Sequence, residues 1–252
     1  MTRSKRTEKR ELRIDLADPT VSAEKPTHPN TTARIGVGRA GARPRTRDTL
    51  LFSADHAVTQ DAIMRPVDPD LLVEMGLLEV HSMVQSREAY LQRPDLGRLL
   101  SPVAVETLQE TLVMRPDVQI FVGDGLSAAA IEHNVPTILP ALQLALATVG
   151  LSVGQPFFVH NARVGLLNAV NGIVDAKVCM VLIGERPGLA RAESLSIYVG
   201  FRPKIDTTDA HRNVISNIYA GGLPPQKAVQ QAVSIAQAMI RQGTSGVELQ
   251  LS

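Results

Sequence analysis

The second half of the sequence alternates short apolar runs with helical stretches, and this alternation limits the fold more than any other feature. The apolar runs lie at Val118–Val122, Phe157–Val159, Val178–Ile183 and Ser196–Phe201. The stretch Thr137–Val149 between the first two runs has a helical pattern. Strands that are buried on both faces of a sheet have such near-continuous apolar sequences, and helices or long connections join them. The pattern therefore predicts an α/β sheet in residues 115–252.

The clearest helix in the sequence lies near the end of this region. Pro224 and Pro225 suit its start, and Gly243 stands where a left-handed C-terminal cap belongs. Its apolar positions recur at helical spacing: Val229, Ala232, Val233, Ala236 and Ile240. This spacing predicts an amphipathic helix with one apolar face toward the core.

The first 114 residues follow a different pattern. Residues 1–30 alternate charge with Pro, Thr and Asn and have no sustained apolar period, which is typical of a flexible tail. Helices are expected at Thr49–Ile63, Leu71–Leu78 and Pro102–Met114, the last with Ser101 as its cap. We therefore divide the chain into a tail over residues 1–30, a helical region with a basic Gly/Arg segment over 31–114, and the α/β domain over 115–252.

The excess of positive over negative charge lies at one end of the chain. Residues 1–47 hold 12 Lys and Arg against 5 Asp and Glu, and the remainder holds 14 against 20. A basic head of this kind can bind nucleic acid, an anionic ligand or an acidic partner protein. Because the whole chain has only 8 aromatic residues and no Trp, bases would find few side chains to stack on, and we do not expect a nucleic-acid partner.

Composition also narrows the kinds of site. The single cysteine, Cys179, excludes an intrachain disulfide and a multi-cysteine zinc site, and its apolar neighbours predict a buried, unreactive thiol. No two histidines have the spacing that would place both on one helix face, so we expect no protein-built metal site. No apolar stretch approaches the roughly 18 residues of a membrane span, and the N-terminus has no apolar signal region. We therefore expect a cytoplasmic protein without a membrane partner.

One glycine motif points to a different function. The sequence Gly36-Val-Gly38-Arg-Ala-Gly41 matches the dinucleotide fingerprint and would suit a nicotinamide-dependent oxidoreductase. That site needs a buried strand before the glycines and a helix directly after them. The preceding segment 31–35 is polar and Pro44 follows closely, so an irregular glycine-rich segment is the preferred interpretation.

Ligands of α/β sheets usually bind beyond the carboxyl ends of the strands, which selects the segments after Val122, Val159 and Ile183. After Ile183, the loop Gly184–Gly188 combines two glycines and a proline with the carboxylate of Glu185, which could accept hydrogen bonds from the amide donors of a large ligand. After Val122, Asp124 and Ser127 could belong to a site or cap the following helix. No histidine lies at an offset that would support a hydrolase triad.

Eight short blocks, taken together and in order, resemble the small subunit of ethanolamine ammonia-lyase. The blocks are Gly38–Thr46, Ala54–His56, Arg93–Asp95, Asp124–Ser127, Pro156–Val159, Gly184–Leu189, Glu193–Ser196 and Ser216–Ile218. They span about residues 33–250. The resemblance implies a helical N-terminal part and a Rossmann-like α/β part.

The resemblance also implies a subunit of a hetero-oligomeric, adenosylcobalamin-dependent enzyme that converts ethanolamine to acetaldehyde and ammonia. In that family a large TIM-barrel subunit holds the substrate, and the cobalamin lies between the two subunits. The radical chemistry belongs to the cofactor, so the small subunit would hold cobalamin in place and supply no catalytic acid or base. Related N-termini can direct the enzyme into a bacterial microcompartment, but residues 1–30 have no pattern that requires it.

The resemblance implies three residues that contact cobalamin, placed by matching the motifs of the family to this sequence. They are Val164 in Ala162–Val164, Glu185 in the loop Gly184–Gly188, and Val214 in Asn213–Ser216. Asp209-Ala-His211 begins like the motif of enzymes in which histidine replaces the cobalamin base, but Val214 occupies the glycine position of that motif. The resemblance therefore implies that dimethylbenzimidazole stays on cobalt.

Overall fold

A computed structural model describes residues 37–188 and 192–251, so the tail predicted for residues 1–30 lies outside the described part. The chain divides into two units, residues 1–54 and 55–252. The described part of the first unit holds a short hairpin of β1 (Arg39–Ala40) and β2 (Arg43–Pro44). The helix α1 (Thr46–Met64) spans the boundary and has no buried residue.

The second unit is built on a six-stranded mixed sheet. In spatial order its strands are β3 (Leu78–His81), β5 (Phe157–His160), β4 (Val118–Gly123), β6 (Val178–Gly184), β7 (Leu195–Phe201) and β8 (Arg212–Ile218). The first four of these are parallel, while β7 runs antiparallel to β6 and β8 antiparallel to β7. The parallel strands therefore all end at one edge of the sheet, and β7 begins there.

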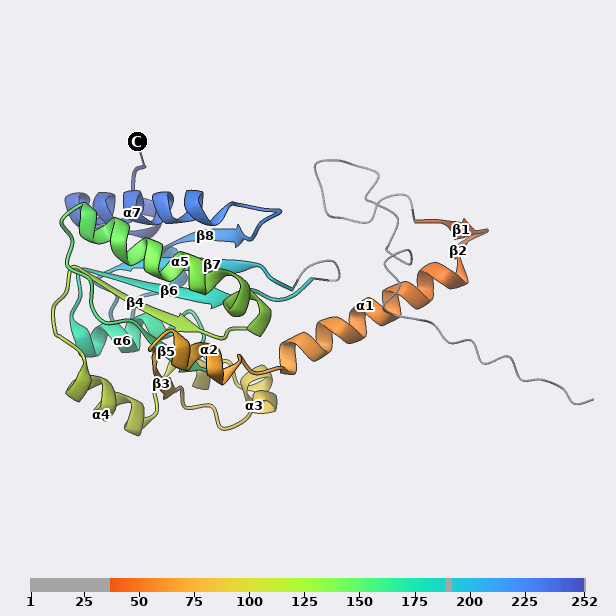
Figure 1. Cartoon of the computed structure of the whole chain (residues 1–252), viewed down its shortest axis with the longest axis horizontal. Helices are drawn as coiled ribbons and strands as arrows, with labels where there is room; N and C mark the ends of the chain where they lie inside the picture. Colours follow the sequence, from red (N-terminus) through yellow and green to blue (C-terminus); the bar gives the residue numbers. More distant parts are fainter. Residues whose placement is uncertain (1–36, 189–191, 252) are drawn as a thin grey trace, which may run out of the picture. The chain divides into compact units, whose positions relative to one another are not determined.

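Helices cover both faces of this sheet (Figure 1). The helices that pack on the sheet are α2 (Pro69–Glu74), α4 (Pro102–Thr111), α5 (Ala128–Thr148), α6 (Leu166–Val174) and α7 (Pro225–Gln242), whereas α3 (Arg87–Gln92) contributes to neither buried layer. One buried layer joins α2, α5 and α7 to one face of the sheet, and a second layer joins α4 and α6 to the other. In β4, Ile120 and Val122 belong to the first layer and Phe121 to the second, as the period of two along a strand requires.

Most of the expected elements are present. The four predicted strands are β4, β5, β6 and β7, and the predicted helix at Thr49–Ile63 is α1. Ser101 caps α4 through a bond from the Ala104 N–H (3.1 Å), and Gly243 ends α7 with φ of 69°. Cys179 is fully buried as expected, and burial raises the pKa of its thiol. The α/β class is therefore confirmed, whereas the finer description as Rossmann-like stays a prediction.

The region over residues 31–114 is not simply helical, which corrects the prediction. The expected helix Leu71–Leu78 ends at Glu74, because Gly76 takes a positive φ of 62° and turns the chain. Leu78 then begins β3, an edge strand of the same sheet that contains β4 to β8. The boundary drawn at residue 114 therefore does not separate the helices from the sheet.

Further differences concern the start of α5 and elements that the sequence analysis did not predict. α5 begins at Ala128 rather than Thr137, because Ser127 caps it and the helix continues through Pro136 and Pro140. The elements α6 and β8 have no counterpart in the sequence prediction.

Within the described residues, the structure contains no helix that is long and apolar enough to cross a membrane.

The ends of β4 and β6 approach each other through glycine backbone. Gly125 has φ of 58°, and the Leu126 N–H donates to the Gly184 carbonyl (3.0 Å). A Cβ on Gly184 would lie 2.4 Å from the Ser127 carbonyl oxygen and 2.6 Å from that of Asp124. These contacts leave no room for a side chain, so glycine at position 184 fixes the spacing of the two turns.

We expect Gly184→Ala to lower the free energy of unfolding by about 1–3 kcal/mol, because the added methyl group must displace backbone. Gly172→Ala is the matched control. Gly172 lies inside α6 with no atom near its missing Cβ, so alanine there should raise the free energy of unfolding by about 0.5–1 kcal/mol. Urea denaturation followed by circular dichroism measures both. Equal effects of the two variants would contradict the close approach.

Candidate functional site

A cleft lies at the sheet edge where the parallel strands end. Its volume is about 200 Å³, and its lining residues come from α3, β7, the end of β6 and the turns after β4, β5 and β6. They are Tyr90, Gly125, Leu126, Arg163, Val164, Ile183, Gly184, Glu185, Arg186, Ser196 and Tyr198. This is the position at which open α/β sheets bind ligands.

Glu185 sits directly after β6 and is fixed by hydrogen bonds from its own chain. Its Oε1 accepts from the Ser196 hydroxyl (2.5 Å) and the Asn217 backbone N–H (2.9 Å), and its Oε2 accepts from the Ser194 hydroxyl (2.7 Å). The Glu185 N–H also donates to the Ser194 carbonyl (3.0 Å). A carboxylate has about four acceptor sites. Three bonds therefore hold Glu185 in place and leave Oε2 with capacity for one more donor.

Val164 lies in the turn between β5 and α6 and is half-buried. Its side chain packs against the core layer of α4 and α6 while it also lines the cleft. The structure thus brings Val164 and Glu185 together, as the strand-end rule predicts. Their common location makes a site with one apolar wall and one fixed acceptor.

Val214 lies outside this cleft. It is on the edge strand β8, its side chain is 48% exposed, and it borders a different hollow of about 680 Å³ beside α7. Its cross-strand neighbour is Tyr198, which does line the cleft. Of the three residues predicted to bind cobalamin, two therefore share a cleft, and Val214 lies one strand away from it.

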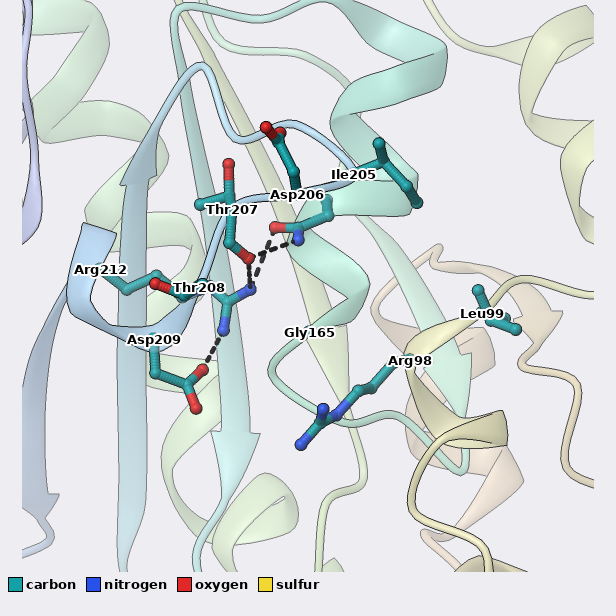
Figure 2. A pocket seen from close by; sticks show the side chains of 10 residues that line it. Arg98, Leu99, Gly165, Ile205, Asp206, Thr207, Thr208, Asp209 and Arg212 are labelled. Atoms are coloured by element: carbon teal, nitrogen blue, oxygen red, sulfur yellow. Dashed lines mark hydrogen bonds and ion pairs between the residues drawn. The ribbon is translucent and has the colours of Figure 1, made fainter.

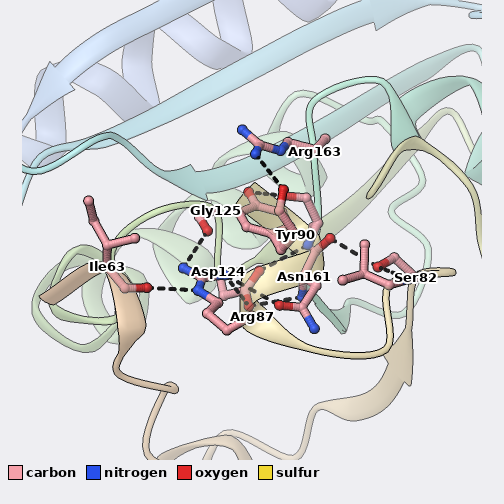
Figure 3. Close-up of polar contacts among 10 residues, drawn as sticks. Ile63, Ser82, Arg87, Tyr90, Asp124, Gly125, Asn161 and Arg163 are labelled. Carbon is pink, nitrogen blue, oxygen red and sulfur yellow. Dashed lines mark hydrogen bonds and ion pairs between the residues drawn. The ribbon is translucent and has the colours of Figure 1, made fainter. Parts of the chain in front are cut away.

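The turn that carries Val164 is held by Asp124 (Figure 3). The two carboxylate oxygens of Asp124 accept from the backbone N–H groups of Asn161 and Ala162, each at 2.9 Å. Arg87 lies 3.4 Å from Asp124 Oδ2, and both side chains are nearly buried. Burial raises the pKa of Asp124, while Arg87 and the two N–H groups partly offset that rise.

Arg87 links this network to α1 and to the turns after β4 and β5, where its Nη1 also donates to Asn161 Oδ1 (3.4 Å). Its Nε donates to the Ile63 carbonyl (2.7 Å) and its Nη2 to the Gly125 carbonyl (2.8 Å). Tyr90 donates its hydroxyl to the Ala162 carbonyl (2.8 Å), and burial raises the pKa of that hydroxyl. The turns after β4 and β5 are therefore tied together by Arg87 and Tyr90, which the sequence analysis did not single out.

Ser127, the other candidate after β4, has a structural role. Ser127 caps α5 through a bond from the Ala130 N–H (3.1 Å), and its hydroxyl also donates to the Ala192 carbonyl. His81 and His160 stack with their rings 4.5 Å apart, and His160 bonds Glu79 (2.8 Å). In the part of the chain that the structure describes, no three His, Cys, Asp or Glu side chains are placed to hold a metal ion.

The described part of the glycine motif gives no support for a dinucleotide site. Gly36 lies outside the described residues, and Gly41 turns the chain with φ of 66° between the two exposed strands of the β1–β2 hairpin. The described end of the motif therefore forms the first strand and the turn of an antiparallel hairpin, whereas a pyrophosphate site needs a helix directly after its glycines. Nothing in the described residues favours the oxidoreductase alternative.

Another hollow, of about 370 Å³, is lined by Gly165, the residue after Val164, and by Arg212 (Figure 2). The guanidinium group of Arg212 pairs with Asp209 and donates to Asn168 Oδ1 (3.0 Å) and the Thr207 carbonyl (3.2 Å). These bonds hold the connection between β7 and β8 against α6. We therefore assign Arg212 a structural role.

The fold and the cleft define a three-layer α/β protein with a small cleft at the carboxyl edge of its sheet. A family model described as ethanolamine ammonia-lyase light chain (EutC) matches residues 23–250. The chain therefore belongs to the ethanolamine ammonia-lyase light chain family, and the resemblance drawn from the eight blocks is confirmed. It is a subunit of an ammonia-lyase.

We expect Asp124→Asn to lower the free energy of unfolding by about 3 kcal/mol, because Arg87 loses its buried carboxylate and one turn N–H loses its acceptor. Asp95→Asn is the control, since the Arg93–Asp95 pair is about 60% exposed on both sides and such pairs contribute little. Denaturant unfolding measures both variants. An Asp124 variant as stable as the Asp95 variant would show that the pair does not hold the turn.

Proposed function

We propose that this chain forms one wall of an adenosylcobalamin site and that a large catalytic subunit forms the other. The main supporting observation is the size and position of the cleft. A complete small-molecule pocket has a volume of roughly 300–1,000 Å³. The cleft has only about 200 Å³ and is open, so it can hold only part of a ligand as large as a corrinoid. The remainder must lie against another surface.

The residues of the cleft fit a part of such a ligand. Val164 and Ile183 supply apolar contact, and Glu185 offers an oriented acceptor. Side-chain amides at the rim of a corrin are donors of the kind that Glu185 would accept. In this proposal Val214, on the adjacent strand β8, also contacts the cofactor through its backbone or its side chain.

Bound adenosylcobalamin would supply a radical, formed when the cobalt–carbon bond breaks, that converts ethanolamine to acetaldehyde and ammonia. The residues of this chain would position the cofactor and exclude water around it. In the proposed assembly the substrate lies in the large subunit, a TIM barrel, and this chain supplies no catalytic acid or base. We also propose that the α/β sheet with its covering helices is Rossmann-like.

The basic segment before α1 is proposed to dock on the large subunit. Arg39, Arg43, Arg45 and Arg47 are all exposed. Arginine forks bind interface carboxylates well. A location inside a bacterial microcompartment stays a prediction that depends on residues 1–30.

The proposed function is tested by reconstitution. Ethanolamine-dependent release of ammonia should require this chain, its large subunit and adenosylcobalamin together. Each component is omitted in turn, and bound corrinoid is followed by absorption. Full activity of the large subunit and cofactor without this chain would contradict the proposal.

We expect Glu185→Ala to weaken adenosylcobalamin binding to the two-subunit complex by about 1–3 kcal/mol, or roughly 5- to 150-fold in Kd, because a ligand donor loses its acceptor. The same change leaves the Asn217 N–H and two hydroxyls without an acceptor, so it should also lower the melting temperature.

Glu106→Ala is the charge-matched control, because Glu106 is exposed on α4. It should leave both the dissociation constant and the melting temperature unchanged. A Glu185 variant that melts early but binds adenosylcobalamin like the wild type would remove Glu185 from the cofactor site and leave it a purely structural role.

A further inference from the structure

Arg163 places a positive charge in the cleft that no carboxylate of the described residues neutralises. Two guanidinium groups stack on Tyr90, Arg163 at 4.0 Å and Arg87 at 4.5 Å from the ring centre. Only Arg87 has an ion-pair partner, Asp124. Glu185 lines the same cleft, but its bonds go to its own strand ends, and no ion pair joins it to Arg163.

The Arg163 side chain is held in one place. Its Nη2 donates to the Tyr90 carbonyl (2.9 Å), and its backbone N–H donates to the Gly97 carbonyl (2.8 Å). Its stem packs so closely on Gly97 that a Cβ there would lie 2.7 Å from Arg163 Cγ. Figure 3 shows the guanidinium beside Tyr90. A preorganised side chain of this kind loses little conformational entropy when it binds a ligand.

The hydrogen-bonding capacity of Arg163 is incompletely used. Its Nε is buried and has no hydrogen-bond partner, and among the described residues its one side-chain bond is the bond from Nη2 to Tyr90. A partly buried cation without a counter-charge is costly unless an anion approaches it. The cleft therefore favours a ligand that brings its own anionic oxygens to Arg163.

If the proposed function holds, the ligand carries such a group. The nucleotide tail of cobalamin contains a phosphodiester, and phosphate oxygens match the planar fork of arginine. We propose that Arg163 binds the phosphodiester of the cobalamin nucleotide tail and so makes this chain selective for the complete cofactor. Arg163 is then a specificity-determining residue that acts together with Glu185 and Val164.

The test compares two ligands on the complex of both subunits. Adenosylcobinamide has the corrin ring, its amides and the adenosyl group but lacks the terminal phosphodiester, ribose and base of the tail. Dissociation constants for adenosylcobalamin and adenosylcobinamide are measured by absorption titration. Arg163→Gln should weaken adenosylcobalamin binding roughly 10- to 100-fold and leave adenosylcobinamide binding within about twofold.

Two further variants separate charge from shape. Arg163→Lys keeps the positive charge, so it should retain more of the adenosylcobalamin affinity than Arg163→Gln. Arg202→Gln removes an exposed arginine that follows the end of β7, at the opposite edge of the sheet from the cleft, and should change neither constant. Melting temperatures of all variants show whether the complex is intact.

Several results would overturn the inference while leaving the proposed function standing. An equal loss for both ligands would place Arg163 at the corrin or in a structural role. A glutamine variant that binds as well as the lysine variant would indicate a neutral partner, such as the ribose or base. Loss of selectivity in Arg186→Gln but not in Arg163→Gln would assign the contact to Arg186. In contrast, a wild-type complex that binds neither ligand would contradict the proposed function itself.

Discussion

The close backbone contact between the turns after β4 and β6 is the constraint on which the cleft depends. The Gly184 carbonyl accepts the Leu126 N–H, and the space beside Gly184 is filled by backbone atoms of Asp124 and Ser127. This contact sets Glu185 against the turn that begins α5. The same turn carries Asp124, whose carboxylate orients the chain after β5. One small area of backbone and one buried carboxylate thus place the residues that form the cleft.

The sequence predicts this edge of the sheet well because its strands are buried on both faces. Burial requires continuous apolar runs, so β4 and β6 stand out, and the loop after β6 is visible from its glycines and proline. The cap at Ser101 and the end of α7 at Gly243 are equally local signals. They depend on a few neighbouring residues, which a sequence displays directly.

The missed features depend on contacts between distant segments. The edge strands β3 and β8 are half exposed, so they have no continuous apolar run, and their pairing with β5 and β7 cannot be seen locally. Arg87 and Tyr90 precede Asp124 by more than 30 positions, and only the folded chain brings them together. Arg163 was overlooked for the same reason, since its unneutralised charge is evident only once Asp124 is seen to pair with Arg87. Family resemblance supplied Val164, Glu185 and Val214 as a set, and the fold places two of them in one cleft.

In the proposed function, this subunit positions a cofactor and leaves the reaction to the cofactor and the partner subunit. The cleft beside Glu185 would then face the corrinoid in the assembled enzyme. An electron cryomicroscopy structure of the two-subunit complex with adenosylcobalamin tests this most directly. The account predicts corrinoid density in contact with Val164 and Glu185, with the rest of the cofactor against the large subunit. Density enclosed entirely by the large subunit, with the cleft open to solvent, would contradict it.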